Sequence, residues 1–404
     1  MKRIFAVLLA LILITLCSCN SFIRFDENGV SNDDGSAIAD DVITIKPSNV
    51  DLPCGELSAY NKLSPPQKFL YSIMLTAISD MELGVIDVTG YSGDTFADAV
   101  IAHRAILCDR PDMFWAPKIF SYLTTESKDS CYICFKDYFA EDDGIGYYGI
   151  TAEEKSAMQA ELDRVLDEVT ANASRYYTDF NKELYLHDYI CDRVTYDKEA
   201  AKDPDAADRN SLTAYGALVN GSAICEGYSK AMQLLCIKSG IPCNVVYGEN
   251  EGVSHMWNIV NPGDGEYYLD VTFDDSSATS IMHIYFNVTK EKLSKTHVFD
   301  EAFAKGKSYE NSDDFNFFNV DCANTAYNYF IKTGAVITED CESAVSAIRN
   351  AQREGKSSLE MLNMTDLSLS DAFLHLRRKA RAEDIAVLNK YYRYDGENMV
   401  VVIW

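Results

Sequence analysis

The amino-acid sequence predicts an α+β fold, and three patterns along the chain support this prediction. Apolar residues recur at helical spacing from residue 64 to about residue 175, as at Ile73 and Ala77. Between Tyr215 and Asp275, one amphipathic helix is followed by segments that alternate like strands. Beyond about residue 311, short strand patterns and helix patterns follow one another, which indicates a small α/β domain.

The composition is that of an ordinary globular protein with an acidic surface. The 404 residues are 47% hydrophobic and 24% charged, and this length is sufficient for two or three domains with their own cores. Lys and Arg number 36 against 62 Asp and Glu, so the formal net charge is −26. Because such a surface repels phosphate backbones, we expect no nucleic-acid partner.

The N-terminus has the order of a secretory signal. Two basic residues precede an apolar run from Ile4 to Leu16, and the small residue Ser18 stands before Cys19. This segment resembles a bacterial lipoprotein signal. The resemblance implies that residues 1–18 are removed and that a lipid on Cys19 anchors an extracytoplasmic protein to the bacterial cell membrane. An uncleaved anchor is the alternative, although the apolar run is shorter than the roughly 20 residues of a spanning helix.

Ten cysteines remain beyond the signal region, and their scattered spacing is not that of a disulfide scaffold. Cys131-x-x-Cys134 is compatible with packing, with a local disulfide or with half of a metal site. No second Cys-x-x-Cys and no paired His lies nearby in the sequence, so we expect no metal. If Cys225 is a free thiol, nine cysteines remain, and at least one of these is also unpaired within a single chain.

Cys225 stands where a reactive thiol would be expected. It precedes an amphipathic pattern from Tyr228 to Cys236, and Gly240 and Pro242 mark the end of this predicted helix. The helix macrodipole favours a thiolate at the N-terminus and so lowers the thiol pKa. The alternative is a buried cysteine that merely begins a helix.

Two predicted strands follow this helix, after a first strand at Cys243–Tyr247. They run from His255 to Val260 and from Glu266 to Phe273. A four-residue loop between them places His255 directly opposite Asp270, where a carboxylate would orient a basic imidazole. Considered in isolation, His255 is more simply a core histidine. A five-residue loop would shift the register and place the two side chains on opposite faces.

The order Cys225-x-Gly-Tyr, His255-x-Trp-Asn and Asp270-x-Thr resembles the transglutaminase-like superfamily of papain-like fold, over about residues 181–298. The resemblance implies a helix bearing Cys225 packed on an antiparallel sheet. It also implies that Cys225 is the nucleophile, that His255 is the general base and acid, and that Asp270 fixes the imidazole.

The chain departs from papain-like proteases in its oxyanion site, because no Gln precedes Cys225 at the expected spacing. The backbone N–H of Cys225 supplies one donor, and Tyr215 or Asn220 is expected to assist. Three further residues of the motifs shape the pocket or belong to the core: Tyr228, Trp257 and Asn258.

These motifs predict a surface-anchored thiol enzyme that acts on amide or peptide bonds and needs no cofactor. With water as acceptor it is a peptidase or amidase, and with an amine it is a transamidase; candidate substrates are proteins and peptides, including cell-wall peptides. The alternative is a non-catalytic binding or scaffold module. We expect five segments: a signal peptide (1–18), a flexible acidic tether (19–63), a mainly helical domain (64–175), a transglutaminase-like catalytic domain (176–305) and a small α/β domain (311–404).

Five secondary-structure elements are expected in the C-terminal domain. They are a strand at Tyr327–Val336, a helix at Cys341–Gln352, a strand at Ser358–Met364, a helix at Leu367–Leu388 and a strand at Tyr391–Trp404.

Overall fold

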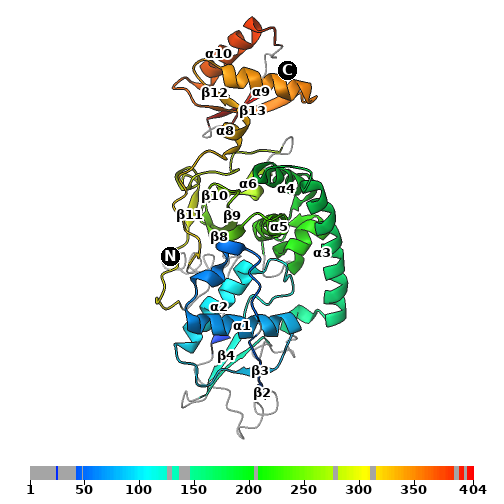
Figure 1. The fold of residues 1–404 in the computed structure, drawn as a ribbon, viewed down its shortest axis with the longest axis vertical. Helices are drawn as coiled ribbons and strands as arrows, with labels where there is room; N and C mark the ends of the chain where they lie inside the picture. Colours follow the sequence, from blue (N-terminus) through cyan, green and yellow to red (C-terminus); the bar gives the residue numbers. More distant parts are fainter. Residues whose placement is uncertain are drawn as a thin grey trace, which may run out of the picture. The chain divides into compact units, whose positions relative to one another are not determined.

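The computed structural model of the protein combines helices and sheets, so the α+β prediction is confirmed (Figure 1). It describes residues 24–25, 42–47, 49–124, 130–135, 146–203, 208–275, 281–309, 315–385, 391–394 and 398–404. The expected signal peptide, the lipidation site Cys19 and most of the tether lie outside these residues. Within the described part of the chain, no helix is both long enough and apolar enough to cross a membrane.

The chain separates into two compact units. The first unit comprises residues 1–263 and 294–320, and the second comprises residues 264–293 and 321–404. These units do not coincide with the five expected segments, whose boundaries remain predictions.

Two capped helices open the folded part of the first unit. α1 (Pro65–Asp80) follows Ser64, which accepts a hydrogen bond from the Gln67 backbone while the Gln67 side chain accepts one from the Ser64 backbone. α2 (Thr95–Asp109) follows Asp94, whose carboxylate accepts a hydrogen bond from the first turn. The two helices pack against each other, as their apolar spacing predicts.

The first unit also contains a five-stranded sheet, and three of its short strands, β3, β4 and β5, lie between the helices of residues 64–175. In Figure 1, β2, β3 and β4 lie on one side of α1. The strand order is β1-β4-β5-β3-β2, and the bounds are Arg24–Phe25 (β1), Val42–Ile43 (β2), Val85–Asp87 (β3), Ser121–Thr124 (β4) and Cys131–Cys134 (β5). Strands this short contain too few alternating positions for the sequence pattern to reveal them.

Two longer helices lead to the helix that carries Cys225. α3 (Ala152–Ala173) begins with a capping box formed by Thr151 and Glu154, and α4 (Asp179–Arg193) follows it. Both helices contact α5 (Cys225–Lys238), which begins at the residue where the sequence predicts it. Short elements complete this region: η1 (Gly55–Leu57), η2 (Ala59–Lys62), η3 (Gly146–Gly149), β6 (Thr195–Tyr196), η4 (Arg209–Leu212), η5 (Gly216–Asn220, a π-helix) and β7 (Ser222–Ala223).

An antiparallel sheet of the first unit packs against α5, as expected of a papain-like core. β8 (Cys243–Asn250) pairs with β9 (Val253–Val260), and Gly248 lies opposite His255 in this register. On its other edge, β8 pairs with β11 (His297–Phe299). The strands expected at Cys243 and at His255 are therefore confirmed, and both are longer than the sequence pattern indicates.

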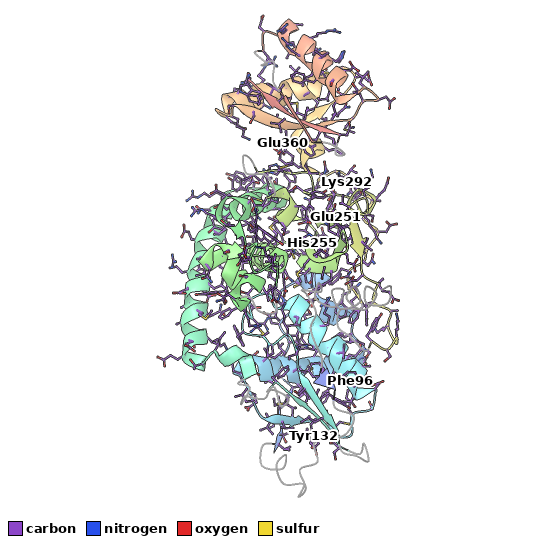
Figure 2. All side chains as sticks on the ribbon, turned by 180° about the vertical axis from the view of Figure 1, so that it is seen from behind. Phe96, Tyr132, Glu251, His255, Lys292 and Glu360 are labelled. Atoms are coloured by element: carbon purple, nitrogen blue, oxygen red, sulfur yellow. The ribbon has the colours of Figure 1, made fainter. Side chains whose placement is uncertain are left out.

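The second unit contains a four-stranded sheet in the order β12-β13-β15-β14. Its elements are β10 (Tyr267–Leu269), α6 (Val271–Asp274), α7 (Lys290–Leu293), α8 (Tyr329–Thr333), β12 (Val336–Ile337), α9 (Glu342–Arg353), β13 (Ser358–Asn363), α10 (Leu369–Ala382), β14 (Tyr391–Tyr394) and β15 (Met399–Ile403). The Glu360 carboxylate on β13 (Figure 2) accepts a hydrogen bond from the His283 backbone N–H, and the His283 ring stacks on Tyr329 at 3.9 Å. This contact joins residues 264–293 to the C-terminal sheet.

Three expected elements of the second unit are wrong in type or extent. The segment expected as a strand at Tyr327–Val336 forms α8, because the Asn328 side chain caps a helix there, and only two residues of β12 follow. The last expected strand is instead the hairpin of β14 and β15. The strand expected at Glu266–Phe273 ends at Leu269, because Asp270 caps α6 and so turns the chain into a helix.

Candidate active site

Cys225 is the first residue of α5, and it is 5% exposed. Ile224 before it is extended and offers no side-chain cap. Orphan backbone N–H groups at the start of a helix favour a thiolate and can also donate to a developing oxyanion. The position therefore suits a nucleophile, as the sequence predicts.

Gly227 lets the first turn of α5 approach the chain segment before it. A Cβ atom at this position would lie 2.8 Å from the carbonyl oxygen of Ser211, 3.0 Å from that of Thr213 and 2.7 Å from the Ala223 Cβ. No larger residue fits without moving backbone atoms. The Gly of the Cys225-x-Gly motif thus has a steric explanation.

Hydrogen bonds connect α5 to the strand that carries His255. The Ser229 hydroxyl donates to the carbonyl oxygen of Met256 at 2.9 Å, and Asn258 Nδ2 donates to the carbonyl oxygen of Ser229 at 2.9 Å. Ser229 is four residues after Cys225, so both lie on one face of the helix. This face is the one that contacts β9, and the contacted residue Met256 directly follows His255.

His255, labelled in Figure 2, lies on β9 and is buried. It belongs to a cluster of aromatic rings. Its ring centroid is 5.9 Å from that of Trp257 and 5.4 Å from that of His297 on β11. Gly248 lies between the two histidine-bearing strands, and a Cβ there would come within 2.6 Å of the Trp257 ring. The absence of a side chain at Gly248 therefore makes room for this cluster.

Asp270, the expected third member of the triad, belongs to the second unit. It is 1% exposed, and its Oδ1 accepts a hydrogen bond from the Phe273 backbone N–H at 3.1 Å, which caps α6. Its backbone N–H donates to the Tyr285 carbonyl oxygen. The opposition of Asp270 and His255 remains a prediction from the register of the sequence.

The two residues expected to supply the second oxyanion donor, Tyr215 and Asn220, have different surroundings. The Tyr215 hydroxyl donates to Glu161 at 2.5 Å, and burial together with this carboxylate raises the pKa of Tyr215 to about 12. Asn220 is exposed at the end of the π-helix η5.

The residues expected to shape the pocket or the core all lie in the core. Tyr228 is fully buried and donates from its hydroxyl to the Val194 carbonyl oxygen at 3.1 Å. Trp257 is fully buried within the ring cluster. Asn258, on β9, is buried and donates a hydrogen bond to the Ser229 carbonyl oxygen on α5. These three residues therefore belong to the packed core around α5 and β9.

Sequence reasoning missed a buried ion network directly after Cys225. Glu226 Oε2 lies 2.6 Å from Lys118 Nζ, and Glu226 Oε1 lies 2.8 Å from Lys230 Nζ. Burial alone would raise the pKa of Glu226, but the two ammonium groups outweigh it and lower this pKa to about 2. The spacing of four residues between Glu226 and Lys230 could have revealed one pair. Lys118 is 108 residues away, and no local pattern points to it.

His297 is the second residue that sequence reasoning missed. It is 2% exposed, its Nδ1 lies 2.8 Å from the Thr296 hydroxyl, and its ring packs edge-on against Trp257 at 5.0 Å. The strand β11 that carries it is only three residues long, so its alternation gave no signal.

No disulfide bond joins the ten cysteines of the described residues, which are Cys54, Cys108, Cys131, Cys134, Cys191, Cys225, Cys236, Cys243, Cys322 and Cys341. Burial raises the pKa of several of them, to about 11 for Cys108 and Cys341 and to about 12 for Cys322. A raised pKa keeps these thiols protonated and unreactive at neutral pH.

Comparison with known proteins places part of this chain in a family. The family model described as Transglutaminase-like superfamily matches residues 163–290, a segment that contains Cys225, His255 and Asp270. No curated protein matches the chain.

Two solved structures are similar to part of the chain. A TGase shares 19% identity and a TM-score of 0.29, over 41% of this chain and 44% of that one. A candidate cysteine protease from Cytophaga hutchinsonii shares 12% identity and a TM-score of 0.24, over 35% of this chain and 51% of that one. This chain thus spans about half the length of each. A similarity this low provides no evidence about function. On the match to the family model, residues 163–290 form a domain of the transglutaminase-like superfamily.

Proposed function

We propose that this chain is a thiol enzyme that acts on amide or peptide bonds through Cys225, His255 and Asp270. The observation that carries the proposal is the link between α5 and β9. α5 begins at Cys225, and one turn later Ser229 is hydrogen-bonded to Met256, the residue after His255. The family model over residues 163–290 supports the same assignment.

The chemistry begins with attack of the Cys225 thiolate on the carbonyl carbon of an amide. A C–S bond forms, and the tetrahedral oxyanion takes a hydrogen bond from the Cys225 backbone N–H. The C–N bond then breaks as the His255 imidazolium gives its proton to the leaving amine, which leaves a thioester on Cys225. Asp270 acts as the positioning residue that orients the imidazole.

The acceptor decides the product of the second half-reaction. Water loses a proton to His255 and attacks the thioester, which releases a carboxylic acid and regenerates the thiolate. A primary amine does the same and yields a new amide. We propose hydrolysis as the main outcome, with protein or peptide substrates that include cell-wall peptides, and neither half-reaction requires a cofactor.

We also propose that the mature chain begins at Cys19 and is held by a lipid on the outer face of the bacterial cell membrane. The order of basic, apolar and small residues before Cys19 supports this location. The test is fractionation of cells that produce the full chain. In a detergent phase separation of the membrane fraction, the wild type should enter the detergent phase and Cys19→Ala should not. A Cys19→Ala protein that still enters the detergent phase would contradict lipidation.

Activity assays with two probes test the enzymatic proposal. Fluorescein-labelled casein reports hydrolysis, and incorporation of dansylcadaverine into casein reports transfer to an amine. Cys225→Ala should abolish both signals, whereas Cys131→Ala, which removes a half-buried thiol on β5, should retain them. Activity that survives Cys225→Ala would contradict the proposal. A wild-type protein that shows neither signal and no acylated Cys225 by mass spectrometry would favour a binding or scaffold module.

A further inference from the structure

We propose that Glu360 on the C-terminal sheet is a positioning residue for the reaction, because it fixes the chain segment that holds Asp270; this inference rests on the proposed function. Residues 282–288 form this segment, the bridging segment. Glu360, the bridging segment and Asp270 all belong to the second unit. The C-terminal sheet thus takes part in the reaction through Asp270.

Asp270 belongs to a helix that is too short to be stable alone. α6 has four residues, and a single turn of helix is unfavourable in water without tertiary contacts. Asp270 Oδ1 caps this turn by accepting a hydrogen bond from the Phe273 backbone N–H at 3.1 Å. The orientation of the Asp270 carboxylate therefore depends on the neighbouring residues that keep α6 folded.

The bridging segment supplies contacts that hold α6. The Tyr285 carbonyl oxygen accepts a hydrogen bond from the Asp270 backbone N–H at 3.2 Å. The backbone N–H groups of Met282 and Tyr285 donate to the Asp274 carbonyl oxygen and to Asp274 Oδ1, each at 3.0 Å. The Tyr285 ring also packs edge-on against Phe273, with the centroids 5.5 Å apart. α6 is thus attached at both of its ends to the bridging segment.

The C-terminal sheet and α8 in turn hold the bridging segment. Glu360 Oε2 on β13 (Figure 2) accepts a hydrogen bond from the His283 backbone N–H at 3.2 Å and lies 3.1 Å from His283 Nδ1. The His283 ring stacks on Tyr329 with an interplanar angle of 9°. Asn328 Nδ2 donates to the Phe286 carbonyl oxygen at 3.2 Å. These contacts connect the C-terminal sheet to the segment that holds α6.

Glu360 has a feature that packing alone does not explain. Its side chain is 8% exposed, and its Oε1 has no hydrogen-bond partner among the residues that the structure describes. A buried carboxylate with one unpaired oxygen costs free energy, and an apolar side chain of similar size would stabilise the core at least as well. Such departures from the rules of packing are expected where a residue serves function. β13 is an inner strand of its sheet and gives Glu360 a rigid support.

The path from Glu360 to Asp270 is short. His283 lies two residues before Tyr285, which binds the Asp270 backbone directly. Loss of the Glu360 carboxylate removes the acceptor of the His283 N–H, so the bridging segment should shift and displace the Tyr285 carbonyl oxygen. A displacement of about 1 Å in a group that orients a catalytic base can cost on the order of 100-fold in rate.

Hydrogen exchange tests this connection without requiring turnover. Glu360→Leu removes the acceptor and keeps a side chain of similar size. Deuterium-exchange mass spectrometry should show about tenfold faster exchange in peptides that contain residues 267–274 and 282–288. Glu360→Gln keeps an acceptor oxygen and should stay within about twofold of the wild type. Unchanged exchange in a folded Glu360→Leu protein would overturn the proposal.

Kinetics test whether this connection serves the reaction. In the casein hydrolysis assay, Glu360→Leu should lower kcat about tenfold and change KM less than about twofold, because Asp270 orients the base and does not bind the substrate. Glu360→Gln should restore most of this kcat. In an Asp270→Asn background, Glu360→Leu should cause no further loss, since Glu360 acts through Asp270. A full tenfold loss in that background would overturn the proposal, because a merely structural role acts independently of Asp270.

Two more variants keep these tests decisive. Glu354→Leu, at an exposed carboxylate of the same unit paired with Lys356, is the matched control and should resemble the wild type in exchange and in kcat. His283→Phe serves as the second variant if Glu360→Leu does not fold. Phe keeps the stacking on Tyr329 and removes the Nδ1 contact, so kcat should fall about threefold at unchanged KM. Wild-type exchange and kcat in that variant would then overturn the proposal.

The two measurements separate this inference from the proposed function. Faster exchange around Asp270 in Glu360→Leu, in a protein whose Cys225 shows no acylation, would reject the enzyme and leave the connection without a role in catalysis. Turnover that requires Cys225 and Asp270 but is unchanged in Glu360→Leu would retain the enzyme and reject Glu360 as a positioning residue.

Discussion

The Ser229 hydroxyl donates a hydrogen bond to the carbonyl oxygen of Met256 at 2.9 Å, and this contact joins the helix of Cys225 to the strand of His255. Both partners are buried, so the bond is shielded from competing water. The contact lies one turn after the proposed nucleophile and one residue after the proposed base. It is therefore well placed to set the separation of the two side chains proposed to be catalytic.

Ser229→Ala should loosen this connection. Removing the hydroxyl leaves a buried carbonyl oxygen with one partner fewer, which should cost about 1 to 3 kcal/mol of unfolding free energy. We expect kcat to fall more than KM changes, because the misalignment affects the chemical step. Ser239→Ala, at the opposite end of the same helix, is the matched control. A Ser229→Ala protein with wild-type kcat would show that the bond is not needed for alignment.

Gly248→Ala should disturb the ring cluster around His255. The added Cβ would come within 2.6 Å of the Trp257 ring, and the backbone of β11 would also have to move. Overpacking of this kind typically costs about 1 to 3 kcal/mol, and we expect a matching fall in the urea midpoint together with reduced activity. Glu249→Ala, at the exposed neighbouring position, should change neither quantity. An unchanged urea midpoint in Gly248→Ala would contradict the close packing described here.

The core of the site could be predicted because its signals are local. The start of α5 at Cys225 follows from a run of helical spacing, and the strand of His255 follows from alternation. Lys118 could not be predicted, since its contact with Glu226 joins residues 108 positions apart. The strand expected through Asp270 was wrong because one side chain, as a helix cap, outweighs the β-propensity of its neighbours.

The buried Glu226 should make stability depend on pH in the acid range. Its pKa is lowered from an ordinary 4.5 to about 2 in the folded protein. The charged form is therefore favoured by folding, and its contribution is present above pH 4.5 and is lost as the pH falls toward 2. This contribution is on the order of 3 kcal/mol.

Urea unfolding from about pH 2 to pH 7 of the wild type and Glu226→Gln measures this effect. The wild type should be more stable at neutral pH, and the difference should shrink as the pH falls below about 4.5. Glu199→Gln, at an exposed carboxylate paired with Lys202, is the control and should follow the wild type throughout. A constant difference between the wild type and Glu226→Gln would mean that the ion network does not titrate in this range.

Asp270→Asn should separate the two roles of this residue. Asn caps a helix about as well as Asp does, so the variant should keep the stability that the cap of α6 provides. It lacks the negative charge that would orient the His255 imidazole, and we expect kcat to fall by at least about 100-fold. Thermal unfolding and steady-state kinetics measure these effects separately. Wild-type kcat in a folded Asp270→Asn protein would remove Asp270 from the proposed triad.

The rate at which iodoacetamide alkylates Cys225, measured from about pH 4 to pH 9 in the wild type and in His255→Ala, tests the central claim most directly. Peptide mapping identifies the labelled thiol, and the raised pKa values of Cys108, Cys322 and Cys341 keep these cysteines slow. An activated thiolate predicts fast labelling of Cys225 well below the free-thiol pKa of about 8.5, and the loss of this labelling in His255→Ala. Labelling that rises only near that pKa, and equally in both proteins, would contradict a catalytic pair of Cys225 and His255.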